Sequence, residues 1–244
     1  MLGGMGPMAG AAFVMRLVAL TPACADQAHI PTLLRNDPRI PDRSQAKIAD
    51  GESPLASMLQ GVYALQTAGA GVIVIPCNTA HFWYDELAAA VSVPILHIVD
   101  AVADELARQG ITSGPVGILG TPATLALGLY QEHLARRGYT CLLPDSAQTH
   151  HACSTAILAV KANRPDLAIR PAQQAIDDMC RQGARAVVLG CTELPLAVPD
   201  QYRRTAVPIA DSIDALARAA ITHRPDRARV IDQQFSMSAA HNVR

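Results

Sequence analysis

The sequence predicts an α/β protein of two pseudo-symmetric domains, each a mostly parallel sheet flanked by helices, with a shared cleft between them. Each half begins with a glycine-rich turn that leads into a helix. Each half ends with a short β-branched apolar run that leads to a cysteine and polar residues. Gly4 precedes Cys77 by nearly as many residues as Gly120 precedes Cys191, so the two halves match in order and spacing.

The first element of each half is a strand that turns at glycine into a helix. A strand near Leu2 precedes a helix expected over residues 8–19, and a strand over 116–119 precedes a helix expected over 123–136. Proline opens both helices, where its missing N–H is not needed for the first turn.

The last element of each half is a buried strand. The runs over 72–75 and 186–189 are short and apolar and show no alternation, as expected for strands covered on both faces. Helices expected over 53–67 and 170–182 precede them, and a glycine follows each helix. Alternating strands and helices predict parallel sheets, whose ligands bind beyond the carboxyl ends of the strands.

We place the first lobe at residues 1–97 together with about 206–224, which should return to it, and the second lobe at 98–205. Each lobe then carries one of the two strand-end cysteines. Residues 225–244 are polar and aperiodic, and we expect a C-terminal tail there.

Composition narrows the class of protein. Half of the 244 residues are hydrophobic and the net charge is −1, so there is ample material for a core and no basic field for nucleic acid. The cysteines form no CxxC pair and no secreted disulfide framework, and no standard zinc spacing occurs. No apolar run approaches the roughly 20 residues that span a bilayer. We therefore expect a cytoplasmic protein with free thiols that binds neither membrane nor nucleic acid.

The residues at the two strand ends suggest proton transfer. Cys77 and Cys191 are each followed by polar residues, unlike core thiols. Two thiols on opposite sides of a small carboxylate substrate can act as a pair of proton-transfer groups. One, as the thiolate, can remove the Cα proton, while the other, as the thiol, returns a proton to the opposite face of Cα. Asn78, Thr79, Thr192 and nearby backbone N–H groups would then hold the carboxylate as charge develops on it.

Four motifs stand in this order along the chain: Leu2-Gly3-Gly4-Met5-Gly6-Pro7, Pro76-Cys77-Asn78-Thr79-Ala80-His81, Gly120-Thr121 and Gly190-Cys191-Thr192-Glu193-Leu194. Together they resemble the aspartate/glutamate racemase family, over roughly residues 1–222. The resemblance implies two pseudo-symmetric α/β domains with the active site in the cleft between them. It also implies a racemase that needs neither pyridoxal phosphate nor a metal.

The resemblance is closest to aspartate racemase. The segment 41–44 resembles the loop that supplies an arginine to the substrate's side-chain carboxylate, and the segment 160–163 resembles the one that supplies a lysine to the same group. Glu193 also resembles the aspartate branch, because glutamate racemases usually carry histidine there. Family members usually have several strand residues before the first glycine motif, whereas here only Met1 and Leu2 precede it.

The resemblance implies that Cys77 and Cys191 are the catalytic residues. It implies that the following residues bind the substrate or shape its loop: Asp42, Arg43, Ser44, Asn78, Thr79, Ala80, Lys161 and Thr192. Family members are often homodimers, so we expect a homodimer that binds a small amino-acid substrate and no cofactor.

Three other interpretations stay open. Hydantoin racemisation or malonate decarboxylation in the same superfamily would keep the cysteines but would not need both Arg43 and Lys161. A non-catalytic two-lobed amino-acid-binding protein would not need two thiols at matched strand ends. The run from Gly4 to Ala9 satisfies the dinucleotide pattern G-x-G-x-x-A, but Asp26 precedes an apolar stretch instead of ending a second strand.

The remaining cysteines and one histidine have a weaker context. His81, four residues after Cys77, could form a Cys–His pair, although such a histidine more often caps or packs. We expect the other thiols to be structural: Cys24, Cys141, Cys153 and Cys180.

Overall fold

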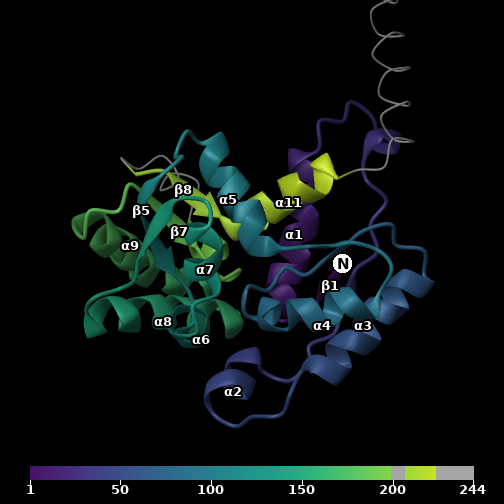
Figure 1. Ribbon diagram of the computed structural model, residues 1–244, viewed down its shortest axis with the longest axis horizontal. Helices are drawn as coiled ribbons and strands as arrows, with labels where there is room; N and C mark the ends of the chain where they lie inside the picture. Colours follow the sequence, from purple (N-terminus) through teal and green to yellow (C-terminus); the bar gives the residue numbers. More distant parts are fainter. Residues whose placement is uncertain (199–206, 224–244) are drawn as a thin grey trace, which may run out of the picture.

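The computed structural model describes residues 1–198 and 207–223 and has the predicted architecture of parallel sheets flanked by helices (Figure 1). None of the helices in these two segments combines the length and apolar character needed to cross a bilayer. The predicted tail, residues 225–244, lies outside the described residues.

The first half of the chain alternates short strands with helices. Its elements are β1 (Leu2–Gly3), α1 (Pro7–Leu20), η1 (Asp26–Ala28), β2 (Arg35–Asn36), α2 (Arg43–Ile48), α3 (Leu55–Thr67), β3 (Ile73–Val74), η2 (Thr79–Trp83), α4 (Tyr84–Ala90) and β4 (Ile95–Leu96). β1 pairs in parallel with β2, and β3 pairs in parallel with β4. The two strands of each pair are only two residues long.

The second half forms a larger sheet. Its elements are α5 (Ile98–Arg108), β5 (Gly114–Leu119), α6 (Pro122–Ala126), α7 (Leu129–Ala135), β6 (Tyr139–Leu142), α8 (Ala147–Lys161), α9 (Pro165–Arg181), β7 (Ala186–Leu189), α10 (Leu194–Ala197), β8 (Ile209–Asp211) and α11 (Ser212–Thr222). Four parallel strands lie in the order β6-β5-β7-β8. Every residue of β7 is buried, as its unbroken apolar sequence predicts for a strand in the middle of a sheet.

Two helices differ from the prediction. The helix expected over 123–136 is two helices, α6 and α7, because Gly128 between them takes a left-handed conformation with φ 75°. The helix expected over 170–182 begins earlier, at Pro165, where proline again occupies the first turn. Pro7 and Pro122 open α1 and α6 as predicted.

The end of the described chain joins the two halves. β8 extends the second-half sheet by pairing with β7, whereas α11 packs against α1 and α5 (Figure 1). Arg16 on α1 and Asp214 on α11 form a two-pronged ion pair with both nitrogen–oxygen distances at 2.6 Å. The boundaries that we placed between the lobes stay a prediction.

The main apolar core crosses from one half to the other. It includes Phe13 of α1, Val102 of α5, Tyr130 of α7, Val188 of β7 and Leu216 of α11, all fully buried. Burying a side chain of this size contributes roughly 1.5–3 kcal/mol. The two halves are therefore held together by the same kind of packing that stabilises each of them.

Gly4, in the turn between β1 and α1, is expected to tolerate no side chain. Its φ is 100°, and a Cβ there would overlap the backbone of Asp37. Gly69 is a matched control, since its φ is 87° and nothing lies within 4 Å of its Cβ position. Gly69→Ala should lose about 1–2 kcal/mol through left-handed strain alone, and Gly4→Ala should lose clearly more. Urea unfolding of both variants tests this, and equal losses would contradict the contact.

Candidate active site

A small cavity collects the predicted site residues from both halves of the chain. Every one of them lines it except Ala80: Asp42, Arg43, Ser44, Cys77, Asn78, Thr79, Lys161, Cys191 and Thr192. Ala80 is fully buried in the apolar core of the first half. Met5, Thr121 and Glu193 complete the lining, and sequence reasoning gave none of these three a role in the site.

The two thiols reach the cavity in the same way. Cys77 follows β3 after a short extension, and Cys191 lies two residues beyond the end of β7. Each is only 5% exposed. The carboxyl ends of these strands thus bring one cysteine from each half to one cavity, as the sequence predicted for their positions. Their chemical roles stay predictions.

Glu193 is the closest polar partner of Cys191. The thiol donates to Glu193 Oε2 at 3.0 Å, and the Thr192 hydroxyl donates to the same oxygen at 3.4 Å. Burial raises the pKa of Cys191 well above its usual value, and the charge and hydrogen bond of Glu193 raise it further. The resting group is therefore a thiol whose proton already points at a carboxylate. The only sequence signal for this contact was the spacing of two residues.

Thr79, the second residue after Cys77, is fixed by the other half. Its hydroxyl oxygen lies 3.2 Å from that of Thr121 and 3.0 Å from that of Thr124, and the latter two are 3.0 Å apart. All three side chains are buried. The cluster ties the turn after β3 to the start of α6.

Arg43 is a buried cation with no carboxylate partner among residues 1–198 and 207–223. It is 7% exposed, and its Nη1 donates to the backbone carbonyls of Ile40 and Pro41 at 3.3 and 2.9 Å. Its Nε has no partner within the same described segments. The nearby carboxylate of Asp42 interacts with this charge, which helps to lower the pKa of Asp42, but it lies beyond ion-pair distance. Burying a charge is costly, so an anion in the cavity would stabilise this arrangement further.

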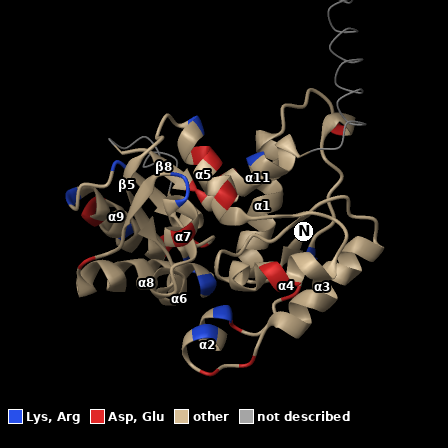
Figure 2. Ribbon diagram, in the orientation of Figure 1, with Lys and Arg blue, Asp and Glu red and all other residues tan. Residues whose placement is uncertain are grey.

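Lys161 brings a second cation to the cavity from the end of α8. Its Nζ lies 3.7 Å from Oδ2 of Asp42, and Figure 2 shows the basic residues of α2 next to this end of α8. Asp42 also caps α2 by accepting from the backbone N–H groups of Ser44 and Gln45 at 2.8 and 2.9 Å. Burial raises the pKa of Asp42, but these bonds and the charges of Lys161 and Arg43 outweigh it and hold the pKa below its usual value.

His81 does not pair with the thiol of Cys77. Its Nδ1 lies 2.9 Å from the carbonyl oxygen of Cys77, and its Nε2 accepts the backbone N–H of Ile98 at 3.2 Å. Nδ1 therefore carries the proton and donates it to the carbonyl. Burial lowers the pKa of His81 to about 4, so the ring is neutral. Both nitrogens serve the backbone, and the ring connects the turn after β3 to α5.

Three of the other cysteines have their thiols shielded. Burial raises the pKa of Cys153 to about 12 and that of Cys141 to about 11, and the Cys153 thiol donates to the carbonyl of Gly120 at 3.4 Å. Cys180 is half-buried against the second-half core. Cys24 is exposed, so it is no part of the core.

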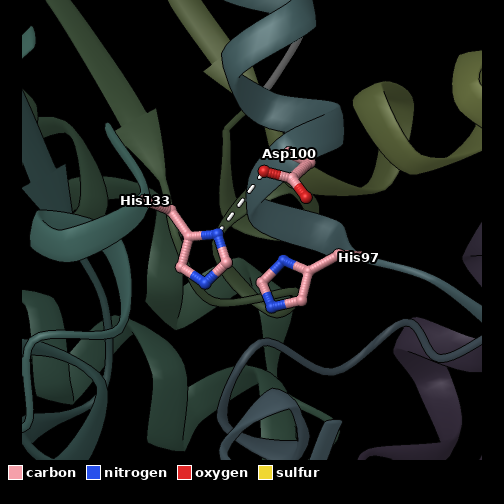
Figure 3. A group of neighbouring side chains, drawn as sticks. All are labelled: His97, Asp100 and His133. Carbon is pink, nitrogen blue, oxygen red and sulfur yellow. Dashed lines mark hydrogen bonds and ion pairs between the residues drawn. The ribbon is translucent and has the colours of Figure 1, made fainter. Parts of the chain in front are cut away.

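In the described part of the chain, one group of side chains has donor atoms close enough for a metal ion, within 4.8 Å of one another: His97, Asp100 and His133 (Figure 3). The imidazoles of His97 and His133 are stacked, with their ring centroids 4.2 Å apart and an angle of 16° between their ring planes. An ion about 2.0–2.1 Å from a nitrogen of each ring must lie near both ring planes, and stacked rings prevent this. His97 Nδ1 also accepts the backbone N–H of Val99 at 3.2 Å. The group is arranged for packing and capping.

Known proteins resemble this chain over most of its length. Residues 2–220 match the family model described as Asp/Glu/Hydantoin racemase. The structure of Picrophilus torridus aspartate racemase superposes with a TM-score of 0.81 and 32% identity, covering 95% of this chain and 97% of that one. The broad specificity amino-acid racemase RacX of Bacillus subtilis (strain 168) is 27% identical over 230 residues, 91% of this chain and 95% of RacX.

More distant structures share the fold alone. Glutamate racemase from Campylobacter jejuni subsp. jejuni has a TM-score of 0.61 and 16% identity, and the match covers 91% of this chain and 84% of that one. The chain is thus similar in fold to proteins whose sequences have diverged widely from it.

Replacing Glu193 should change the acidity of Cys191. Glu193→Gln removes the charge that disfavours the thiolate, so the pKa of Cys191 should fall, while burial keeps it above its usual value. The ultraviolet absorbance of the thiolate, followed against pH, measures this as the difference between Glu193→Gln and the same protein with Cys191→Ala. Glu86→Gln, an exposed position on α4, is the control. An unchanged pKa of Cys191 in Glu193→Gln would rule out an electrostatic effect of Glu193 on this thiol.

Proposed function

The chain belongs to the Asp/Glu/hydantoin racemase family, and on that premise we propose that it interconverts L- and D-aspartate, or a close acidic amino acid, without a cofactor. The proposal includes two-base proton transfer by Cys77 and Cys191, a cytoplasmic location and a homodimeric assembly. Its support comes from the family and from what the cavity offers a substrate.

The buried guanidinium of Arg43, which has no carboxylate within ion-pair distance in the described residues, is the observation that carries the proposal. Arg43 and Lys161 come from opposite halves and line the same cavity as the two thiols. A substrate with a side-chain carboxylate would supply the missing counter-charge, and a guanidinium can grip a carboxylate through two nitrogens. Asn78, Thr79 and Thr192 would remain for the α-carboxylate.

The proposed reaction moves one proton off Cα and another on. A thiolate on one side takes the Cα proton, and the electron pair of the broken C–H bond moves into the α-carboxylate to give an enediolate. The thiol on the other side then donates its proton to the opposite face of Cα, and that pair of electrons forms the new C–H bond. The thiolate that takes the Cα proton becomes a thiol, and the thiol that donates its proton becomes a thiolate, so charge is conserved. When Cys191 acts as the base, Glu193 accepts its resting proton beforehand.

The alternatives leave part of the cavity unexplained. A hydantoin has no carboxylate for Arg43 and Lys161. Malonate decarboxylation would keep the cysteines but would not need both Arg43 and Lys161, and a binding protein would need neither thiol. In the dinucleotide interpretation the Gly4 turn would face a pyrophosphate, whereas its backbone packs against Asp37. An acidic amino-acid substrate uses all of these groups.

The two thiols should behave as one unit. Cys77→Ala and Cys191→Ala should each abolish racemisation of aspartate, and the double variant should be little worse, because residues that act together are strongly non-additive. Cys153→Ala is the matched control, since this thiol is also buried but lies outside the cavity. Racemisation is followed by circular dichroism after dialysis against a chelator, with no pyridoxal phosphate added. Near-normal racemisation by either folded single variant, or activity that depends on an added cofactor, would overturn the proposal.

The two cations should set the preference for acidic substrates. Arg43→Met and Lys161→Met should each cost aspartate about 2–5 kcal/mol of transition-state stabilisation, partly because a substrate carboxylate is left unpaired. Alanine, which lacks that carboxylate, should lose little of whatever rate it has.

The measurement is kcat/KM for aspartate and for alanine in each variant. Lys47→Met, on the helix α2 that also carries Arg43, is the control. The Lys47 ammonium lies over the ring of Trp83, 4.5 Å from the ring centroid, and not in the cavity. Equal losses for the two substrates would mean that Arg43 and Lys161 serve the fold and not the substrate.

A further inference from the structure

Tyr130 reaches both cysteine-bearing turns although it lines no part of the cavity. It lies on α7 and is fully buried. Its hydroxyl donates to Oδ1 of Asn78, the residue after Cys77, at 2.6 Å. Its ring packs over Gly190, the residue before Cys191, where a Cβ would come within 2.8 Å of Tyr130 Cε2. One side chain thus spans the two strand ends.

The side-chain amide of Asn78 is held from both sides. Tyr130 donates to its oxygen, and its nitrogen donates to Ser212 Oγ at 3.1 Å. If the amide flipped, its N–H would meet the phenol oxygen and the buried phenol proton would lose the Asn78 oxygen that accepts it, so the hydroxyl favours the observed orientation. Burial keeps that proton in place by raising the pKa of Tyr130 well above its usual value. The second N–H of the Asn78 amide has no protein partner in the described residues, and Asn78 lines the cavity.

We propose that Tyr130 is a positioning residue for the proposed racemisation: it holds the Asn78 amide so that an N–H, and not the carbonyl oxygen, faces the α-carboxylate of the substrate. The inference rests on the proposed function and adds a residue to it. Tyr130 acts through Asn78 and does not touch the substrate.

The orientation matters because an amide can flip. Without the Tyr130 hydroxyl, the Asn78 oxygen can turn toward Ser212, whose hydroxyl can donate as well as accept. The flipped amide then presents an oxygen lone pair to the cavity. That oxygen repels a carboxylate and would repel the enediolate more strongly, since negative charge grows as the Cα proton leaves.

Tyr130→Phe removes the hydroxyl and keeps the ring. Binding of succinate, a dicarboxylate without an amino group, should weaken roughly tenfold, and kcat/KM for aspartate should fall roughly ten- to hundredfold, with part of the loss in kcat. Tyr139→Phe is the matched control. Tyr139 is a buried tyrosine of β6, the strand after α7, and its hydroxyl donates to the carbonyl of Ile111 at 2.7 Å, away from the cavity. It should lose similar stability and keep its kcat, KM and succinate affinity.

A double-mutant cycle tests whether Tyr130 acts through Asn78. In an Asn78→Ala protein the amide is gone, so adding Tyr130→Phe should leave succinate binding and kcat/KM within about twofold of Asn78→Ala alone. This double variant also removes both partners of the hydrogen bond together, which costs little stability, so the comparison survives if Tyr130→Phe alone folds poorly. Thermal unfolding of all variants accompanies the kinetics.

The outcomes separate this inference from the proposed function. A wild-type protein that neither binds succinate nor exchanges the Cα proton of any amino acid would overturn the proposed function. An active wild type with an equally active Tyr130→Phe would overturn the positioning role alone. The positioning role is also overturned if Tyr139→Phe loses as much activity as Tyr130→Phe. It is likewise overturned if Tyr130→Phe still lowers kcat/KM or succinate affinity tenfold in the Asn78→Ala background.

Discussion

A buried cluster of three threonine hydroxyls joins the turn after β3 in the first half of the chain to the start of α6, after β5, in the second half. Thr79 belongs to the turn after β3, whereas Thr121 and Thr124 open α6 in the other half. Neighbouring contacts between Arg16 and Asp214 and within the shared apolar core hold the halves in the same relation. The site depends on this relation, because each half alone supplies only one thiol and one of the two cations.

The cationic and anionic side chains of the cavity have different neighbours. Arg43 and Lys161 line the cavity that we propose for a side-chain carboxylate, while Glu193 lies beside the thiol of Cys191. Asp42 keeps its negative charge engaged by capping α2 and by facing Lys161. The buried guanidinium of Arg43 has no carboxylate within ion-pair distance in the described residues, and this is why we propose a ligand with a side-chain carboxylate.

Local patterns predicted what depends on local sequence. The apolar run over 186–189 is β7, and proline opens α1 and α6, because burial of a strand and the first turn of a helix are set by neighbouring residues. The break at Gly128 was missed, since glycine inside a helical pattern is often tolerated. The site residues converge as their motifs implied, apart from Ala80. The bond from Cys191 to Glu193 is local, but the spacing of two residues does not by itself place the carboxylate at the thiol. The contact of Tyr130 with Asn78 is a tertiary one, 52 residues apart in the chain, which no sequence spacing encodes.

The cations of the cavity also bear on the thiols. The charge of Lys161 lowers the pKa of Cys191 and so opposes the effects of burial and of Glu193. In the proposed reaction, a dicarboxylate substrate neutralises Lys161 and Arg43 when it binds. A thiolate of Cys191 would then lose the stabilising charge of Lys161 and become a stronger base, at the moment when the weakly acidic Cα proton lies beside it. Substrate binding and base strength would thereby be coupled through Lys161. An amino acid without a side-chain carboxylate would leave Lys161 charged and the thiolate weaker, so the proposed preference for acidic substrates would act on the proton transfer as well as on binding.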